Sequence, residues 1–167
     1  YDTLASGLVS NGHVTTESLW VSGTDYQVTT STYDSYGFRD RVTDSLGYQT
    51  TFTPDSASMY VASTVDPLNA TISYTYDYTT GKVKQLTNQN GFKFITTYDG
   101  FGRPTQSNQP DPLNSSTSVT KTTWSYDDHS VPVSVHQTDY FDATHARESY
   151  SYFDGFGRLI QQRVEAQ

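Results

Sequence analysis

Hydrophobic and polar residues alternate with a period of two along short stretches of this chain, and turn-forming residues separate the stretches. Three twelve-residue windows that begin 22 positions apart show the pattern best: 44–55 (DSLGYQTTFTPD), 66–77 (DPLNATISYTYD) and 88–99 (NQNGFKFITTYD). Each window opens with Asp or Asn and has Gly or Asn at its fourth position, which is typical of a tight turn containing a positive φ. The alternation that follows predicts a strand, and helical spacing fits none of the windows.

The large side chains of the three windows share one parity along the expected strands. We therefore expect them to face the same side of a sheet and to be more buried than the Thr and Ser residues of the other parity. The set expected to be more buried is Tyr48, Phe52, Ile72, Tyr74, Tyr76, Phe92, Phe94 and Tyr98. The set expected to be more exposed is Thr51, Ser73, Thr75 and Thr97.

Each window ends at an aspartate that begins a second turn and a return strand. The clearest copies are Tyr98-Asp99-Gly100-Phe101-Gly102-Arg103 and Phe153-Asp154-Gly155-Phe156-Gly157-Arg158. The marker aspartates are Asp34, Asp55, Asp77, Asp99, Asp127 and Asp154, at steps of 21, 22, 22, 28 and 27 residues. The expected turn glycines are Gly37, Gly81, Gly102 and Gly157, and the cations that follow them are Arg39, Lys82, Arg103 and Arg158. Twenty-two residues accommodate two strands and two short turns, so we expect an all-β chain, a meander of antiparallel hairpins.

Two of these repeats are longer than the others. The last two steps exceed 22 residues because the segments 111–127 and 139–154 carry insertions near their first turns. Since both insertions fall at turns, they lengthen loops and do not interrupt the expected order of strands.

Composition supports a folded β protein and excludes several functions. The 167 residues include only three Glu, but 14 Tyr, eight Phe and two Trp, so helix formers are scarce and buriable aromatic area is available. The net charge is −8 with ten Lys and Arg, which leaves no basic stripe for nucleic acid. Without an 18-residue apolar run we expect no membrane span, and without cysteine there is neither a disulfide nor thiol chemistry.

The repeats resemble the Rhs/YD-repeat family, whose hallmark is Tyr-Asp followed by a small turn, Gly-Arg and a return strand. The segment 150–161 (YSYFDGFGRLIQ) is most similar to the B component of bacterial insecticidal toxin complexes. Three markers, at positions 55, 77 and 127, depart from the family pattern because they lack a full Gly-Arg. The resemblance divides the chain into a poorly matched leading segment, 1–30, and one continuous repeat domain, 31–167.

This resemblance implies a β-ribbon that curves and spirals to form the wall of a hollow shell. In toxin complexes such a shell is similar to a container for an unfolded toxic segment, and in other proteins it is an extracellular scaffold. We therefore expect a non-enzymatic structural scaffold, extracellular or secreted, whose partners are further YD repeats of the same or a parent chain and a toxin cargo. Unpaired groups on the terminal strands also predict edge-to-edge self-association. The alternatives are a surface adhesion or carbohydrate-binding module, or a self-assembling filament subunit.

The sequence contains no pattern typical of a catalytic or metal site, and we expect no cofactor. The aspartates lie at periodic turn positions, where capping of backbone N–H groups explains them better than paired acid–base chemistry. No nucleophile elbow, phosphate loop or dinucleotide fingerprint occurs in the sequence. His129 follows Asp127 and Asp128, yet a polar hairpin tip is the simpler interpretation, and we predict no metal site.

Three smaller groups of residues have both a structural and a functional interpretation. The turn cations could line an anionic groove, but pairing with an Asp of a neighbouring hairpin is the simpler expectation. Four aromatic residues at turns could stack on sugar rings or fold back onto the sheet: Tyr36, Phe38, Tyr78 and Phe101. Asn69 and Asn114 begin glycosylation sequons, which matter only if the protein is secreted by a eukaryote.

Overall fold

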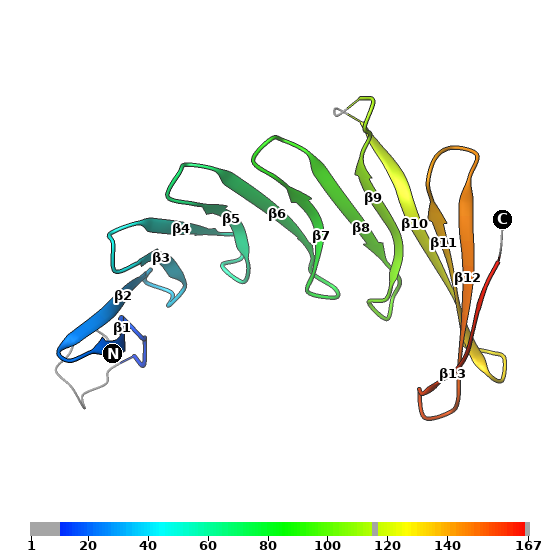
Figure 1. Ribbon diagram of the computed structural model, residues 1–167, viewed down its shortest axis with the longest axis horizontal. Coiled ribbons are helices and arrows are strands. Elements are labelled where there is room, and N and C mark those ends of the chain that lie inside the picture. Colours follow the sequence, from blue (N-terminus) through cyan, green and yellow to red (C-terminus); the bar gives the residue numbers. More distant parts are fainter. Residues whose placement is uncertain (1–10, 115–116, 166–167) are drawn as a thin grey trace. The chain divides into compact units, whose positions relative to one another are not determined.

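The computed structural model describes residues 11–114 and 117–165, and in this part of the chain every regular element is a β-strand (Figure 1). The strands are β1 (Thr16–Ser22), β2 (Asp25–Tyr33), β3 (Arg39–Thr43), β4 (Gln49–Pro54), β5 (Val61–Val65), β6 (Thr71–Asp77), β7 (Lys82–Thr87), β8 (Lys93–Tyr98), β9 (Pro104–Pro110), β10 (Ser118–Asp127), β11 (Val133–Tyr140), β12 (Ala146–Phe153) and β13 (Leu159–Val164). Their order in the sheet is their order in the sequence. The predicted all-β antiparallel meander is therefore confirmed, whereas its spiralling stays a prediction.

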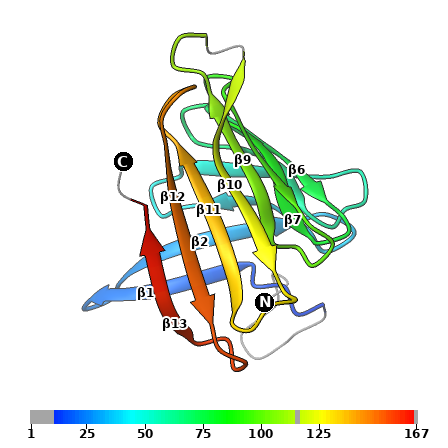
Figure 2. The ribbon, with the colours of Figure 1, turned by 90° about the vertical axis from the view of Figure 1, so that its right-hand side faces the viewer.

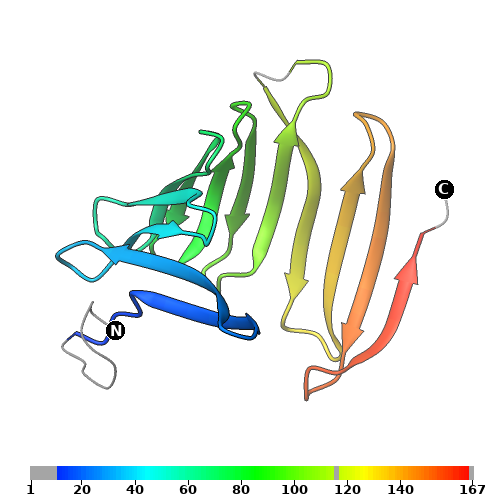
Figure 3. The ribbon, with the colours of Figure 1, turned by 60° about the vertical axis from the view of Figure 1, so that its left-hand side comes forward.

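The chain divides into two compact units, residues 1–74 and residues 75–167. In the described part of the N-terminal unit, the strands from β1 onward form successive hairpins, coloured blue to cyan in Figure 3. In the C-terminal unit the strands β9 to β13 follow one another in the same way (Figure 2). The leading segment 1–30, poorly matched in sequence, supplies β1 and most of β2 and so takes part in the same meander.

Six hairpin turns share one construction: 34–38, 44–48, 66–70, 88–92, 99–103 and 154–158. The first residue of each is Asp or Asn, and its Oδ1 accepts the backbone N–H groups of the third and fifth residues at 2.8–3.0 Å. The fourth residue has a positive φ, between 63° and 86°, and is Gly37, Gly47, Asn69, Gly91, Gly102 or Gly157. This confirms the turns predicted from Asp or Asn followed by Gly or Asn, and it is the geometry of a three-residue hairpin loop.

Four of the marker turns are followed by a shift in strand register. We call the end that carries the marker aspartates the marker end, and the other the opposite end. After a marker turn the pairing shifts by one residue, for example from Tyr98↔Pro104 to Thr97↔Gln106. The same shift follows the marker turns at 34–38, 55–60 and 154–158. Such a bulge increases the local twist of the strands.

Burial follows the predicted parity in β6 and at most of the other positions: Phe52, Phe92 and Tyr98 are half-buried and Thr97 is exposed, as predicted. Ile72, Tyr74 and Tyr76 are half-buried, while Ser73 and Thr75 are exposed, as predicted. The prediction is wrong for Tyr48 and Phe94, which are 57% and 39% exposed, and for Thr51, which is half-buried.

These differences have a common physical reason. Among the described residues no hydrophobic side chain is fully buried. Each is covered by its neighbours on adjacent strands and not by a second layer, so burial depends on position along the strand as well as on parity. Tyr48 closes the turn 44–48 just before β4, where few cross-strand neighbours can cover it.

The turn geometry predicts opposite effects for two glycines of one turn. Gly102 has a φ of +76°, and a Cβ there would lie 3.4 Å from Thr80 Cγ2, so Gly102→Ala should lower the free energy of unfolding by about 1–2 kcal/mol. Gly100 lacks a positive φ and has open space around its Cα, so Gly100→Ala should leave stability unchanged or raise it by up to about 1 kcal/mol. Urea unfolding of both variants measures the difference. Equal midpoints would contradict the assignment of strain to the fourth turn position.

Candidate functional site: clasps at the marker end and a hollow at the opposite end

At the marker end of the C-terminal unit, tyrosines connect successive hairpins. The Tyr98 hydroxyl in β8 donates to the carbonyl of Val83 in β7 at 2.9 Å. The Tyr126 hydroxyl in β10 donates to the carbonyl of Pro104 in β9 at 2.8 Å. In both cases the accepting residue directly follows the turn cation of the preceding marker turn.

The turn cations complete these connections. Arg103 lies over the Tyr126 ring at 4.0 Å from its centroid, and Lys82 lies 5.5 Å from the centroid of Tyr98. The Lys82 ammonium also donates to the carbonyl of Gly102 in the next marker turn, at 2.6 Å. We call this arrangement of a tyrosine, a backbone carbonyl and a basic residue a clasp, because it joins one marker turn to the turn before it.

A clasp also occurs in the N-terminal unit, where the sequence pattern did not indicate one. The Tyr33 hydroxyl donates to the carbonyl of Val14 at 3.0 Å, and the imidazole of His13 stacks on the Tyr33 ring at 4.5 Å. Gly12, just before His13, has a φ of +81°. Gly12-His13-Val14 thus matches Gly81-Lys82-Val83, with His in place of a permanent cation. The order of Gly, a basic residue and Val is the signal that could have located it.

The arginines of the other marker turns differ in their partners. Arg103 donates to Asp128 of the next hairpin and to Asp99 of its own turn, both at 2.7 Å, so the predicted pairing with an Asp of a neighbouring hairpin is confirmed for this one of the four turn cations. Arg158 pairs with Asp154 inside its own turn at 2.7 Å. Arg39 lies 5.5 Å from the ring centroid of Phe52. Only the first of these three contacts crosses from one hairpin to the next as a salt bridge.

Hydrogen bonds in the turns favour the ionised form of the marker carboxylates of Asp99, Asp127 and Asp154. The pKa of Asp154 is lowered chiefly by the Arg158 side chain, and that of Asp127 chiefly by the Ser130 hydroxyl. Burial opposes ionisation of Asp99, but bonds from the backbone and side chain of Arg103 still give it a lowered pKa. The Arg103 guanidinium, bonded first to Asp128 and then to Asp99, has a raised pKa. These groups act as fixed acceptors and donors in the turns.

The three markers without a full Gly-Arg also cap turns. Asp55 accepts the N–H of Met59, and Asp77 accepts the N–H of Thr79, both at 2.9 Å. Gly81 closes the Asp77 turn by donating to the Asp77 carbonyl at 2.7 Å. Asp127 accepts the N–H of His129 at 3.0 Å, so that histidine lies in a capped turn. In the described ranges no three His, Asp or Glu side chains gather as a metal site would require.

The turn aromatics and the sequons lie at hairpin tips. Tyr36 and Phe101 are 83% and 84% exposed and so do not fold back onto the sheet, whereas Tyr78, 56% exposed, lines a hollow with Lys84 and Thr96 of the strands. Phe38 is half-buried and does so. Asn69 is exposed at the positive-φ position of the turn 66–70, and Asn114 is exposed in the turn after β9.

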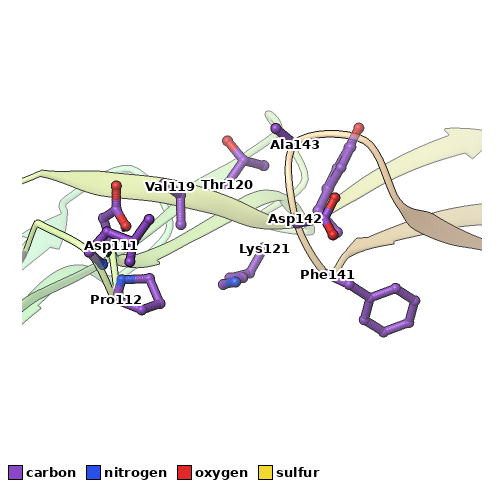
Figure 4. A pocket seen from close by; sticks show the side chains of 10 residues that line it. Asp111, Pro112, Val119, Thr120, Lys121, Phe141, Asp142 and Ala143 are labelled. Carbon is purple, nitrogen blue, oxygen red and sulfur yellow. Dashed lines mark hydrogen bonds between the residues drawn. The ribbon is translucent and has the colours of Figure 1, made fainter.

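A hollow of about 530 Å³ lies at the opposite end of the C-terminal unit, between the loop after β9 and the hairpin of β11 and β12 (Figure 4). Its apolar lining includes Leu113, Val119, Tyr140 and Phe141. The two inserted segments of the sequence meet here. Sequence reasoning identified both insertions but missed the hollow, because nothing in either segment shows that they are adjacent.

Three charged side chains also line the hollow. The pairing of β10 with β9 shifts between Thr120 and Thr122, so Lys121 is the extra residue of a bulge, a feature that re-aims a side chain. Figure 4 shows Lys121 between the loop of Asp111 and the hairpin of Asp142. The pKa of Asp142 is lowered, first by the Thr144 backbone N–H and then by the His145 side chain. The hollow therefore combines apolar walls with charges of both signs.

Comparison with known proteins shows likeness in fold and not in sequence. No family model and no curated protein matches the chain. Two crystal structures, titled TcdB2-TccC3-TEV and TcdB2-TccC3, each match 89% of this chain with a TM-score of 0.68, at 14% and 16% identity. A structure titled TcdB2-TccC3-Cdc42 matches 90% with a TM-score of 0.67 and 13% identity. The chain spans 12%, 9% and 12% of these structures' chains, so it has the fold of a small segment of them. The resemblance to toxin-complex proteins is confirmed at the level of fold.

The clasp predicts a stability cost for the loss of one hydroxyl. Tyr126→Phe keeps the ring beneath Arg103 but leaves the Pro104 carbonyl without its donor, so the free energy of unfolding should fall by about 1 kcal/mol. Tyr36→Phe removes a hydroxyl from a tip side chain that is 83% exposed, and should leave stability unchanged. Urea unfolding of the full chain, followed by a signal that reports on both units, measures both variants. A Tyr126→Phe variant as stable as the wild type would show that the clasp does not stabilise the ribbon.

The lowered pKa of Asp154 predicts a pH dependence confined to its own turn. Because the folded pKa lies below the usual 3.8, ionisation of Asp154 stabilises the turn above that value, and the stabilisation is lost as pH falls through the folded pKa. Hydrogen-exchange protection of the Phe156 and Arg158 amides should therefore fall below about pH 4. The amides of Asn90 and Phe92 bond to Asn88, which does not titrate, and are the internal control. Parallel loss of protection in both turns would point to general unfolding instead.

Proposed function

We propose that this chain is a non-enzymatic structural scaffold, a YD-repeat segment in the wall of an extracellular, toxin-encapsulating β-shell. The observation that carries the proposal is the recurrence of the clasp. Tyr33, Tyr98 and Tyr126 each donate to the main chain just after the previous turn's basic residue. A contact that recurs between successive hairpins suits a wall that lengthens by addition of hairpins.

The surface of the hairpins supports the same proposal. Large apolar side chains stand at the tips at both ends, among them Leu46 and Leu68 at the opposite end, which are 79% and 86% exposed. Exposed apolar groups at successive tips offer surface that other protein can cover. Further YD repeats of the same or a parent chain would cover the tips, and a toxin cargo would lie against the wall. The fold shared with TcdB2-TccC3 supports the scaffold part of this proposal.

A surface adhesion or carbohydrate-binding module is the second candidate. Exposed rings at the tips favour it, since Tyr36, Tyr78 and Phe101 offer faces on which a sugar ring can stack. Selective binding of the isolated chain to a glycan array would favour this candidate over the wall.

The wall proposal predicts that the chain can replace the matched segment of TcdB2-TccC3. Residues 11–165 should be grafted into that position, and the graft should be exposed to an added protease. If the chain acts as wall, the hypervariable C-terminal region named for that protein should remain uncut during the time in which the same region alone is fully digested. Gel electrophoresis over time provides the measurement.

A matched control graft carries Asp99→Ala and Arg103→Ala, which removes one capped turn and its salt bridge to Asp128. We expect it to assemble with a local gap and to lose part of the protection. A folded graft whose C-terminal region is digested as fast as the free region would contradict the wall proposal.

A further inference from the structure

The last marker turn, 154–158, presents an aromatic ring and a guanidinium to solvent. Phe156 is 87% exposed, and the Arg158 side chain is 74% exposed. Nε and Nη2 of Arg158 both contact Oδ2 of Asp154 at 2.7 Å. The guanidinium has five N–H groups, so the others remain available to a further partner. The equivalent Arg103, 32% exposed, is held by Asp99, Asp128 and Tyr126. The tip 154–158 is thus the Gly-Arg turn whose aromatic and cationic groups are most available.

The hollow at the opposite end has the complementary chemistry. Leu113, Tyr140 and Phe141 supply an apolar wall, and all three are themselves exposed in the isolated chain. Its volume of about 530 Å³ falls within the roughly 300–1,000 Å³ of clefts that hold compact ligands. An aromatic ring placed there would be covered by apolar groups on several sides, and Phe141 and Tyr140 offer faces to a guanidinium.

The tip and the hollow each carry a cation and a carboxylate, so each can pair with the opposite charge on the other. The tip carries the Arg158 cation beside the Asp154 carboxylate. The hollow carries the Asp111 and Asp142 carboxylates beside Lys121, which the bulge in β10 aims toward it. Guanidinium groups bind carboxylates through directional, charge-assisted hydrogen bonds, so Arg158 can bind a rim carboxylate while Lys121 binds Asp154.

We propose that the hollow binds the 154–158 tip of a second copy of this chain. A chain cannot place this tip in its own hollow, because β12 begins beside the hollow at Ala146 and its eight residues carry the chain to the marker end, about 25 Å away. The contact therefore joins the marker end of one copy to the opposite end of the next. Such a head-to-tail interface leaves an unused tip and an unused hollow at its two ends, and association continues beyond two copies. The inference rests on the scaffold function, for which it names the surfaces that bring hairpins of separate ribbons together.

Two variants test this contact in the full chain. The tip variant carries Phe156→Ser and Arg158→Ser, and the hollow variant carries Leu113→Ser and Phe141→Ser. All four side chains are exposed, so both variants should retain the wild-type circular dichroism and a cooperative melt, with at most a small loss of stability in the tip variant from the missing Arg158–Asp154 pair. In sedimentation velocity over a series of concentrations, the average mass of the wild-type species should rise with concentration. Each variant alone should associate at least about tenfold more weakly.

The mixture of the two variants provides the decisive measurement. The tip variant retains an intact hollow and the hollow variant an intact tip, so an equal mixture should form complexes of two copies and stop there. A Tyr36→Ser variant, which alters an equally exposed tip in another turn, should associate like the wild type. A wild type that stays a single copy, variants that associate as strongly as the wild type, or a mixture that remains single copies would each overturn the proposal. The protease-protection experiment concerns the wall itself and can succeed when this contact fails, so the two failures are distinguishable.

Discussion

The whole ribbon depends on one local interaction, the acceptance of two backbone N–H groups by the first side chain of a five-residue turn. With Oδ1 of an Asp or Asn bonded to the third and fifth residues, the loop length is fixed and the fourth residue must adopt a positive φ. That loop fixes which residues face each other across the hairpin, because strand register follows loop length and turn type. Six turns built in this way let hairpins of similar length follow one another without a covering layer.

Cohesion between hairpins then comes from polar contacts, since the sheet has little buried apolar volume in its described part. The tyrosine before a marker aspartate reaches back to a backbone carbonyl and so satisfies an acceptor at the start of the preceding strand. The basic residue beside that carbonyl covers the tyrosine ring, as Arg103 covers Tyr126. The Tyr-Asp pair therefore acts in two directions, with Asp closing its own turn and Tyr holding the turn before it. This explains why the two residues occur together in the repeat.

The sequence predicted the features that residues close together in the chain determine, namely the strands and the turns. It missed the features that depend on contacts between residues far apart in the chain. Strands and capped turns follow from alternation and from Asp or Asn three positions before Gly, which are local patterns. The burial of Tyr48 and Phe94 depends on which side chains of adjacent strands cover them, and parity alone does not determine this. The His13–Tyr33 clasp joins residues 20 positions apart and uses an imidazole where the pattern has Arg or Lys. The hollow depends on two insertions that only the strand register brings together.

Insertions at hairpin ends offer a way to add function without disturbing the ribbon. A longer loop costs little in closure entropy and leaves the strand ladder intact, as β10 and β11 show by pairing in register between the two inserted segments. The marker end cannot vary so freely, because its turns also carry the clasps. Among the described residues the clasps lie at the marker end, whereas at the opposite end residues 111–113 and 140–143 line a concave, charged surface. Because cohesion depends on the marker end, the loops of the other end can change in length without loss of the contacts between hairpins.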